Sequence, residues 1–213
     1  MSRTAQVSTG AAHAGAPAVD TRRVLLRAAY HEIHAAGFQA ASLTRILDQA
    51  GLTKGALYYH FASKRELGYA VVDEVIRTFI ETTWIAPLAE AQDPIAGLQS
   101  LLAAGRDHLS ETAVLLGCPL TNLAQEMSGI DEGFRTRIAA IYDRWREAIA
   151  ATIDRGQRRG TVDAALDPRR VADFFVVVLE GALTLAKNRR DPSLIADTAA
   201  EFARYLETLR RVG

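Results

Sequence analysis

The sequence has few of the residues and runs that mark secreted, membrane-spanning or disulfide-bonded proteins. Its 213 residues include one cysteine, Cys118, which excludes an intrachain disulfide and favours a reducing compartment. No apolar run reaches the roughly 18 residues of a membrane span, and the nearest candidate, residues 174–186, carries Glu180. Residues 1–19 lack the apolar run of a signal peptide, and their small and polar residues predict a flexible arm. The sequence therefore predicts a cytoplasmic protein with no membrane partner.

Catalytic and metal-binding motifs are also missing. The chain has no Gly-x-Ser-x-Gly, no glycine-rich phosphate loop and no Cys-x-x-Cys. His31 and His34 are spaced i, i+3, whereas a zinc-protease helix needs i, i+4 and a third ligand. We expect both histidines on a solvated helix face. The sequence thus predicts no enzyme activity, no cofactor and no metal site.

Aromatic residues are scarce as well, at 7%, while alanine and leucine are abundant, which favours helices over strands. Prolines and glycines punctuate stretches of helical periodicity, and no alternation of period two lasts long enough for a strand. We therefore predict an all-α fold of about nine helices. The predicted helices cover residues 21–36, 43–50, 54–60, 64–86, 94–109, 119–128, 132–158, 168–188 and 192–211.

The net charge is formally zero, but the charge is unevenly distributed. Residues 21–66 carry seven Lys or Arg and three acids, a balance of 7 − 3 = +4, whereas residues 67–155 carry seven basic and thirteen acidic residues, a balance of −6. A basic head on an acidic body suits a protein whose head alone contacts phosphates, although random scatter of surface charge is the alternative. We predict an arm over 1–19, a DNA-binding domain over 20–66 and a second domain over 67–213.

Residues 42–61, SLTRILDQAGLTKGALYYHF, have the pattern of two short helices joined by a tight turn. Gly51 permits the positive φ that such a turn needs. Leu57 and Phe61 point inward at i, i+4, which leaves a second helix with small residues at its start and exposed tyrosines. Small residues allow close approach to base edges, and flanking hydroxyls and cations can bind phosphate. The alternative, a hairpin packed inside a bundle, is disfavoured by the exposed tyrosines.

The run from Ala50 to Phe61, with Ser63–Leu67 after it, resembles the signature of the tetracycline-repressor family. The match covers about residues 21–70, and the rest of the chain is similar to the family in helix layout. The resemblance implies a homodimer that binds a near-palindromic operator and releases it when a small molecule enters the second domain. Ala62 stands where the family often has proline or lysine, so the resemblance is weaker in that loop.

The resemblance also implies roles for single residues. Lys54, Gly55 and Ala56 would face bases, and a larger polar set would hold the DNA backbone. That set is Ser42, Thr44, Arg45, Tyr58, His60 and Lys64, and Thr53 and Tyr59 complete the candidates for the DNA interface. Lys64 lies at a helix start, where backbone amides also favour phosphate.

Two apolar helices near the C-terminus are the candidates for a dimer interface. Residues 171–185 are apolar almost all round, which requires burial on several sides. DNA with two half-sites requires two heads, so a four-helix interface between two chains fits better than an intrachain core. The predicted interface residues are Phe174, Val178, Gly181, Ala182, Leu185, Ile195, Phe202, Leu206 and Leu209.

An effector cavity is predicted among the helices between residues 64 and 188. Its candidate walls are Phe79, Trp84, Leu120, Tyr142 and Phe175, with Asn122 as a polar anchor and Cys118 as a wall or a sensor. If Pro119 is the first helical residue, Cys118 is the N-cap, and the helix start lowers its pKa. A small buried residue at a tight junction is the competing interpretation. Such walls suit a hydrophobic or electrophilic effector.

These observations predict a ligand-responsive DNA-binding regulator, with repression as the expected sign. A DNA-associated helical protein without a small-molecule switch is the first alternative. A helical binding protein that does not contact DNA is the second, and the basic head argues against it.

Overall fold

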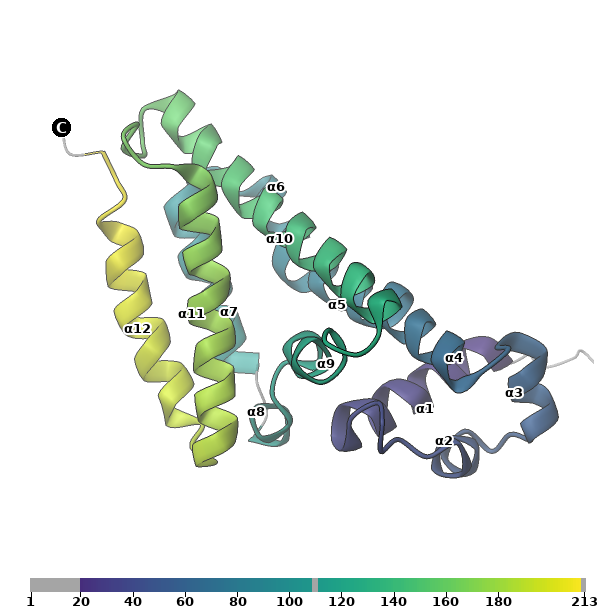
Figure 1. Cartoon of the computed structure of the whole chain (residues 1–213). Coiled ribbons are helices and arrows are strands. Elements are labelled where there is room, and N and C mark those ends of the chain that lie inside the picture. The colour runs from purple at the N-terminus through teal and green to yellow at the C-terminus, as the bar shows by residue number, and fades with distance from the viewer. Residues whose placement is uncertain (1–19, 109–110, 212–213) are drawn as a thin grey trace, which may run out of the picture.

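The computed structural model describes residues 20–108 and 111–211, and these residues are almost entirely helical. Three short helices, α1 (Thr21–Ala36), α2 (Leu43–Ala50) and α3 (Lys54–His60), form one end of the molecule (Figure 1). The predicted all-α fold is confirmed, and these three helices end where the sequence predicts. The predicted arm over 1–19 lies outside the described residues.

A long helical rod leaves this end of the molecule (Figure 1). It comprises α4 (Lys64–Ala70), a π-helical segment η1 (Val71–Ile76), α5 (Arg77–Ile80), a second π-helical segment η2 (Glu81–Ile85) and α6 (Ala86–Glu90). The prediction that the helix ends before Pro87 is wrong. The π-helical turn of η2 directly before Pro87 shifts the hydrogen-bond ladder, so the missing N–H of proline is tolerated.

Six further helices complete the larger part of the molecule. They are α7 (Pro94–His108), α8 (Glu111–Leu116), α9 (Pro119–Met127), α10 (Glu132–Arg159), α11 (Pro168–Arg189) and α12 (Ser193–Glu207). Helix α8 was not predicted, because six residues are too few to show a helical period. The last helix ends before the predicted residue 211, since Leu209 packs into the core and Arg210 bridges to Val162. No described helix is long and apolar enough to cross a bilayer.

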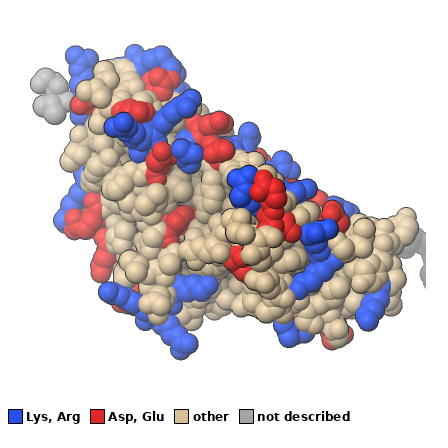
Figure 2. All heavy atoms as spheres, viewed as in Figure 1, with Lys and Arg blue, Asp and Glu red and all other residues tan. Residues whose placement is uncertain are grey.

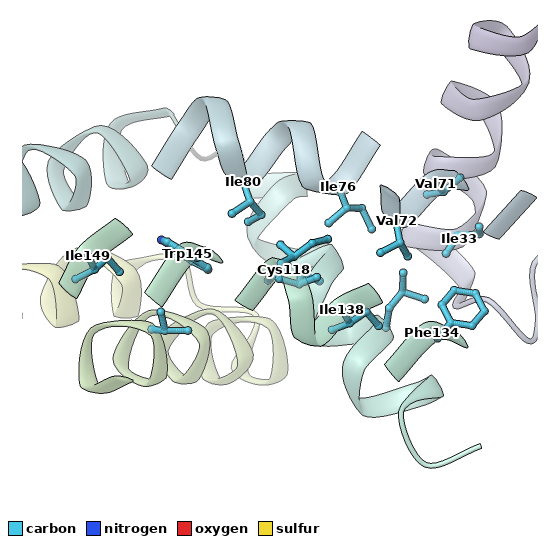
Figure 3. Packing of buried hydrophobic residues seen from close by; sticks show 14 of the residues in the cluster. Ile33, Val71, Val72, Ile76, Ile80, Cys118, Phe134, Ile138, Trp145 and Ile149 are labelled. Carbon is cyan, nitrogen blue, oxygen red and sulfur yellow. The ribbon is translucent and has the colours of Figure 1, made fainter. Parts of the chain in front are cut away.

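One hydrophobic core runs through both parts of the molecule. Figure 3 shows buried side chains in a continuous row, from Ile149 and Trp145 of α10 past Ile80 and Ile76 to Ile33 of α1. Most of these side chains are 2% exposed or less. The row means that the end formed by α1–α3 is packed against the larger part rather than tethered to it.

A carboxylate on α9 holds the loop that follows α1. Glu126 accepts hydrogen bonds from the backbone N–H groups of Phe38 and Gln39, each at 2.8 Å. The loop comes close because Gly37, at φ +81°, has no Cβ to meet the Glu126 carboxylate. On the other side of α1, His34 Nε2 lies 2.8 Å from the carbonyl oxygen of Gly117, just before α9. Both ends of α9 are therefore bonded to the α1 region.

We expect Glu126→Ala to lower the free energy of unfolding by about 1–3 kcal/mol, because two backbone donors lose a charged acceptor. Urea denaturation followed by circular dichroism measures this change. Glu201→Ala is the matched control, since Glu201 pairs with Arg204 on the exposed face of α12. Its effect should stay below about 0.5 kcal/mol. Equal effects of the two substitutions would contradict a structural role for Glu126.

Candidate functional site

The α2–α3 segment is built as a helix-turn-helix. Ser42 caps α2 by accepting from the Arg45 backbone N–H, and Thr53 caps α3 by accepting from the N–H of Ala56. Gly51 between them has φ +65° and lies in the left-handed region, as the turn was predicted to require. Leu57, fully buried, and Phe61 anchor α3 to the core. This anchoring fixes which face of α3 is left outside.

The outer face of α3 presents most of the residues predicted to contact DNA. Tyr58 is 54% exposed and Tyr59 85% exposed, and Thr53, Lys54 and Gly55 are exposed as well. Ala56 and His60 are half-buried at its edges. A Cβ added at Gly55 would meet only Thr53 Oγ1, at 3.7 Å, so the backbone at the start of α3 is open. This surface can approach a base edge closely.

Two predicted phosphate ligands already have partners within the chain. Arg45, 60% exposed and next to the exposed Thr44, pairs with Glu32 and lowers the pKa of that carboxyl. The Lys64 ammonium donates to the carbonyl oxygen of Gln39 at 3.0 Å and lies over the Phe38 ring. Each cation keeps further N–H donors, so these contacts orient the two side chains and leave them able to bind an anion.

The face of the molecule in Figure 2 shows how charge is distributed. Over the end formed by α1–α3, blue Lys and Arg side chains outnumber red acids, whereas both signs mix over the helices of the larger part. Part of the basic charge is paired within the chain: the Arg22 guanidinium pairs with Glu74 and lies over the Phe61 ring. The exposed cation on α3 is Lys54.

A cavity of about 310 Å³ lies in the larger part of the molecule and reaches α1. Its walls come from α1, the α5–η2 segment, α7, the α8–α9 junction, α10 and α11. The wall residues are Tyr30, His34, Phe79, Ile80, Thr83, Trp84, Leu101, Ala104, Gly105, Ala113, Gly117, Cys118, Pro119, Trp145, Leu179, Glu180 and Leu183. Phe79, Trp84 and Cys118 were predicted as walls, and the structure brings these three together.

The other predicted wall residues lie elsewhere. Leu120 and Phe175 are fully buried in the core. Tyr142 makes a hydrogen bond of 2.7 Å to Thr121 behind the wall. Asn122 lines a separate groove of about 460 Å³ between α1 and α9, where it binds the Leu116 carbonyl oxygen and Lys187. The helical periodicity placed these residues inward, but only the packing decides whether an inward residue meets a cavity or a neighbouring side chain.

The polar centre of the cavity wall is Glu180, which the sequence analysis did not single out as a site residue. The residue is only 9% exposed, and Thr121 Oγ1 donates to its Oε2. Burial raises the pKa of this carboxyl, against the opposing effect of hydrogen bonds from Thr121 and Cys118. No described group bonds to Glu180 Oε1 or to the indole Nε1 of Trp145, which is also buried. The signal available in the sequence was an acid in an otherwise apolar helix.

The predicted low pKa of Cys118 is wrong. Cys118 is the N-cap of α9 as predicted, but its side chain makes no capping hydrogen bond. Burial in the core raises the pKa of the thiol far above its ordinary value, and the nearby Glu180 carboxyl raises it further. The helix start favours a thiolate by a much smaller amount than burial disfavours it. Cys118 is therefore a buried thiol.

Two cavity residues on α1 were also unexpected. His34 was predicted on a solvated face, yet it is half-buried, and burial lowers the pKa of its imidazole. A neutral His34 donates from Nε2 to the Gly117 carbonyl oxygen, which fixes its tautomer. Tyr30 borders the same cavity. His31, by contrast, is exposed as predicted.

The predicted interface residues divide into two groups. Phe202, Leu206, Leu209 and Ala182 are at most 8% exposed, because α11 and α12 pack against each other and α12 also packs against α7 of the same chain. These four side chains therefore face the core of their own chain and leave little surface for a partner. Phe174 and Leu185 are 44% and 51% exposed, Gly181 is exposed, and Val178 and Ile195 are half-buried. Val177, 65% exposed and not predicted, belongs to the same face of α11.

Comparison with known proteins identifies the class to which this fold and surface belong. The family described as bacterial regulatory proteins of the tetR family matches residues 25–71, and the tetracyclin repressor-like C-terminal domain matches residues 94–202. The chain belongs to the tetracycline-repressor family and is a DNA-binding transcriptional regulator. This family is one of transcription regulators rather than of enzymes.

Individual relatives agree with this assignment. The transcriptional regulator AcuR of Cereibacter sphaeroides is 26% identical over 184 residues, which cover 86% of this chain and 84% of AcuR. The transcriptional repressor DhaR of Mycobacterium sp. is 29% identical over 156 residues, covering 73% and 76% of the two chains. A TetR regulator from Chloroflexus aurantiacus superposes with a TM-score of 0.81 at 25% identity, over 91% of this chain and 98% of that one.

The raised pKa of Glu180 predicts a specific dependence of stability on pH. The folded chain holds a proton that the unfolded chain releases above about pH 4.5, so stability should fall as pH rises from that value. We expect Glu180→Gln to gain stability relative to the native chain between about pH 4.5 and pH 7.5. Urea denaturation at both pH values measures the difference.

Glu74→Gln is the control with the opposite sign. The Arg22 guanidinium lowers the pKa of Glu74, so the stability from this pair is present at neutral pH and is lost as pH falls. Glu74→Gln should therefore lose stability at neutral pH. A Glu180→Gln variant with the same pH profile as the native chain would show that Glu180 is ionised throughout.

Proposed function

We propose that this protein is a ligand-responsive repressor that binds a near-palindromic operator as a homodimer and releases it when a small molecule occupies the cavity. The observation that carries the proposal is the wall of the cavity. It includes residues of α1, the helix against which α2 and α3 pack. The repressor DhaR supports the sign of regulation by its similarity. A repressor of this kind acts in the cytoplasm, where bacterial DNA lies.

The proposed DNA interface is the outer face of the helix-turn-helix, within a DNA-binding domain over residues 20–66. Lys54, Gly55 and Ala56, at the start of α3, would meet base edges in the major groove. Thr53, Tyr58 and Tyr59 supply hydroxyls on the same exposed face. Ser42, Thr44, Arg45, His60 and Lys64 would contact the DNA backbone on either side.

The proposed dimer interface is the exposed apolar face of α11, in the domain over residues 67–213. Phe174, Val177, Gly181 and Leu185 follow one another at helical spacing along this face. Exposed apolar stripes of this length are uncommon on monomers and suit a contact between two copies. Gly181, with no heavy atom within 4 Å of a built Cβ, allows a partner helix to come close.

The cavity supports the ligand-responsive interpretation over a regulator without a small-molecule switch. Its volume of about 310 Å³ lies in the range of small-molecule sites, and its walls are mainly apolar and aromatic. A ligand shifts a population only if it binds one arrangement of the two DNA-binding ends better than the other. A ligand in the cavity would contact α1 directly, so its affinity would depend on how α1, and with it the DNA-binding end, is placed.

Replacing residues of α3 should separate base recognition from backbone contact. We expect a random-site selection with the native chain to enrich a palindrome. Lys54→Ala should bind it with an altered base preference, and the discrimination between bases at one position should change by about 1–3 kcal/mol. Tyr58→Phe should weaken all duplexes to a similar degree. Fluorescence anisotropy at several salt concentrations measures both effects.

Lys187→Ala, which removes the same charge from α11, is the control for Lys54→Ala. It should leave operator affinity nearly unchanged at moderate salt. The proposed interface is wrong if selection enriches no palindrome, or if Lys54→Ala and Lys187→Ala behave alike.

A charge on the exposed face of α11 should dissociate the dimer. We expect Val177→Asp to convert a dimer into a folded monomer, because it places an unpaired charge in an apolar contact. Ile130→Asp is the control, since Ile130 is 64% exposed but lies in the turn between α9 and α10. Light scattering gives the masses. A monomeric native chain at micromolar concentration would refute the interface.

A further inference from the structure

The cavity contains two buried polar groups that have no partner. Glu180 Oε1 and Trp145 Nε1 both belong to wall residues, and neither has a hydrogen-bond partner among the described residues. An unpaired polar atom in an apolar interior costs on the order of 1–3 kcal/mol, so such atoms are uncommon unless something else binds them. Their presence in one cavity indicates that a ligand completes their hydrogen bonding.

The neighbours of Glu180 determine which kind of partner its free oxygen needs. Tyr142 contacts Thr121 Oγ1 at 2.7 Å, and Thr121 in turn donates to Glu180 Oε2. The Cys118 thiol also bonds to this carboxyl. Oε2 accepts from Thr121, the residue is buried, and no Lys or Arg is among the described wall residues, so a neutral carboxyl with its proton on Oε1 is the form that fits these surroundings. Glu180 Oε1 is then a donor, as the indole N–H of Trp145 always is.

We propose that the effector is a neutral carbonyl compound, a ketone, ester or lactone, whose oxygen atoms accept hydrogen bonds from Glu180 Oε1 and Trp145 Nε1. Its hydrocarbon body lies against Trp84 and Leu183. These two residues also line a small apolar cavity of about 40 Å³ beside α7, α11 and α12, so the two cavities share these walls. The proposal deepens the proposed function by naming the chemical class that the cavity takes.

Charged effectors fit the same walls less well. A carboxylate needs a cation, and no Lys or Arg is among the wall residues that the structure describes. Burial lowers the pKa of the His34 imidazole, which favours its neutral form, and its N–H already donates to the Gly117 carbonyl oxygen. An ammonium group needs an ionised acid, which the surroundings of Glu180 oppose, and it cannot accept from Trp145. A neutral acceptor is the class that leaves no buried charge uncompensated.

Three probes of nearly equal shape distinguish these classes: 1-adamantyl methyl ketone, 1-(1-adamantyl)ethylamine and adamantane-1-carboxylate. Both tryptophans of the chain, Trp84 and Trp145, line the cavity, so their emission reports binding, and calorimetry gives the affinity. We expect the ketone to bind at least about tenfold more tightly than either charged probe. Failure of all three probes to bind up to their solubility would overturn the proposal.

Matched variants test the two hydrogen bonds. Trp145→Phe removes the N–H and keeps an aromatic ring, and should weaken ketone binding about three- to tenfold. Trp84→Phe makes the same change in ring size at a residue that only packs against the ligand, so it should weaken ketone binding less than Trp145→Phe does. Glu180→Gln keeps an N–H donor and should retain ketone binding, whereas Glu180→Leu should lose it about as much as Trp145→Phe does.

The outcomes separate this proposal from the proposed function. Tightest binding of the amine, with loss in Glu180→Gln, would mean an ionised Glu180 and would overturn the neutral class. Equal ketone affinity in Trp145→Phe and the native chain would do the same. If the ketone binds as expected but leaves operator affinity unchanged, the cavity chemistry stands and the ligand-responsive function fails. Circular dichroism confirms that each variant is folded.

Discussion

The structure depends on the contact between α9 and the loop after α1. The Glu126 carboxylate accepts from two successive backbone N–H groups of that loop, and Gly37 makes the approach possible. Without this contact, α1 would be held to the larger part by the rod that begins at α4, by side-chain pairs such as Arg22 with Glu74, and by apolar packing. With it, α9 is fixed at both ends, since His34 binds the carbonyl oxygen of Gly117 just before its start. The two ends of the molecule therefore cannot move independently of α9.

The same constraint explains why the cavity lies where it does. The chain turns sharply at Gly117, at φ +75°, and enters α9 at Pro119, so Cys118 faces inward beside Glu180. Bulky side chains meet at this junction from α10 and η2, where the Trp84 and Trp145 rings lie 5.3 Å apart. The space bounded by these rings and by the turn at Gly117 is part of the cavity. The buried thiol and the buried carboxyl share this space, and neither titrates in its ordinary range.

The helices and the helix-turn-helix could be predicted from the sequence, because caps, turns and apolar spacing are local. Ser42, Gly51 and Thr53 do what their residue types imply. The cavity wall and the open face of α11 could not be predicted in the same way. Residues 171–185 are apolar almost all round, so periodicity cannot tell which side meets α10, which meets α12 and which stays open. The apolar stripe of α12 does not by itself distinguish packing inside one chain from packing between two chains. For Cys118, the helix start was visible in the sequence, whereas the burial that outweighs it arises only from tertiary packing.

The position of Tyr30 and His34 has a consequence for how a ligand could act. In a protein whose ligand site is remote from its DNA-binding helices, a displacement must pass through several elements, each of which can absorb part of it. Here α1 is itself a wall of the cavity and packs directly on α2 and α3. A ligand that takes up space beside Gly117 pushes on the carbonyl oxygen that His34 binds, and a shift of α9 moves the carboxylate that holds Phe38 and Gln39. Both contacts act on the C-terminal end of α1 and on the loop that follows it. A ligand that binds one arrangement of α1 and α9 more tightly than another would therefore shift the orientation of α3 through few intermediate contacts.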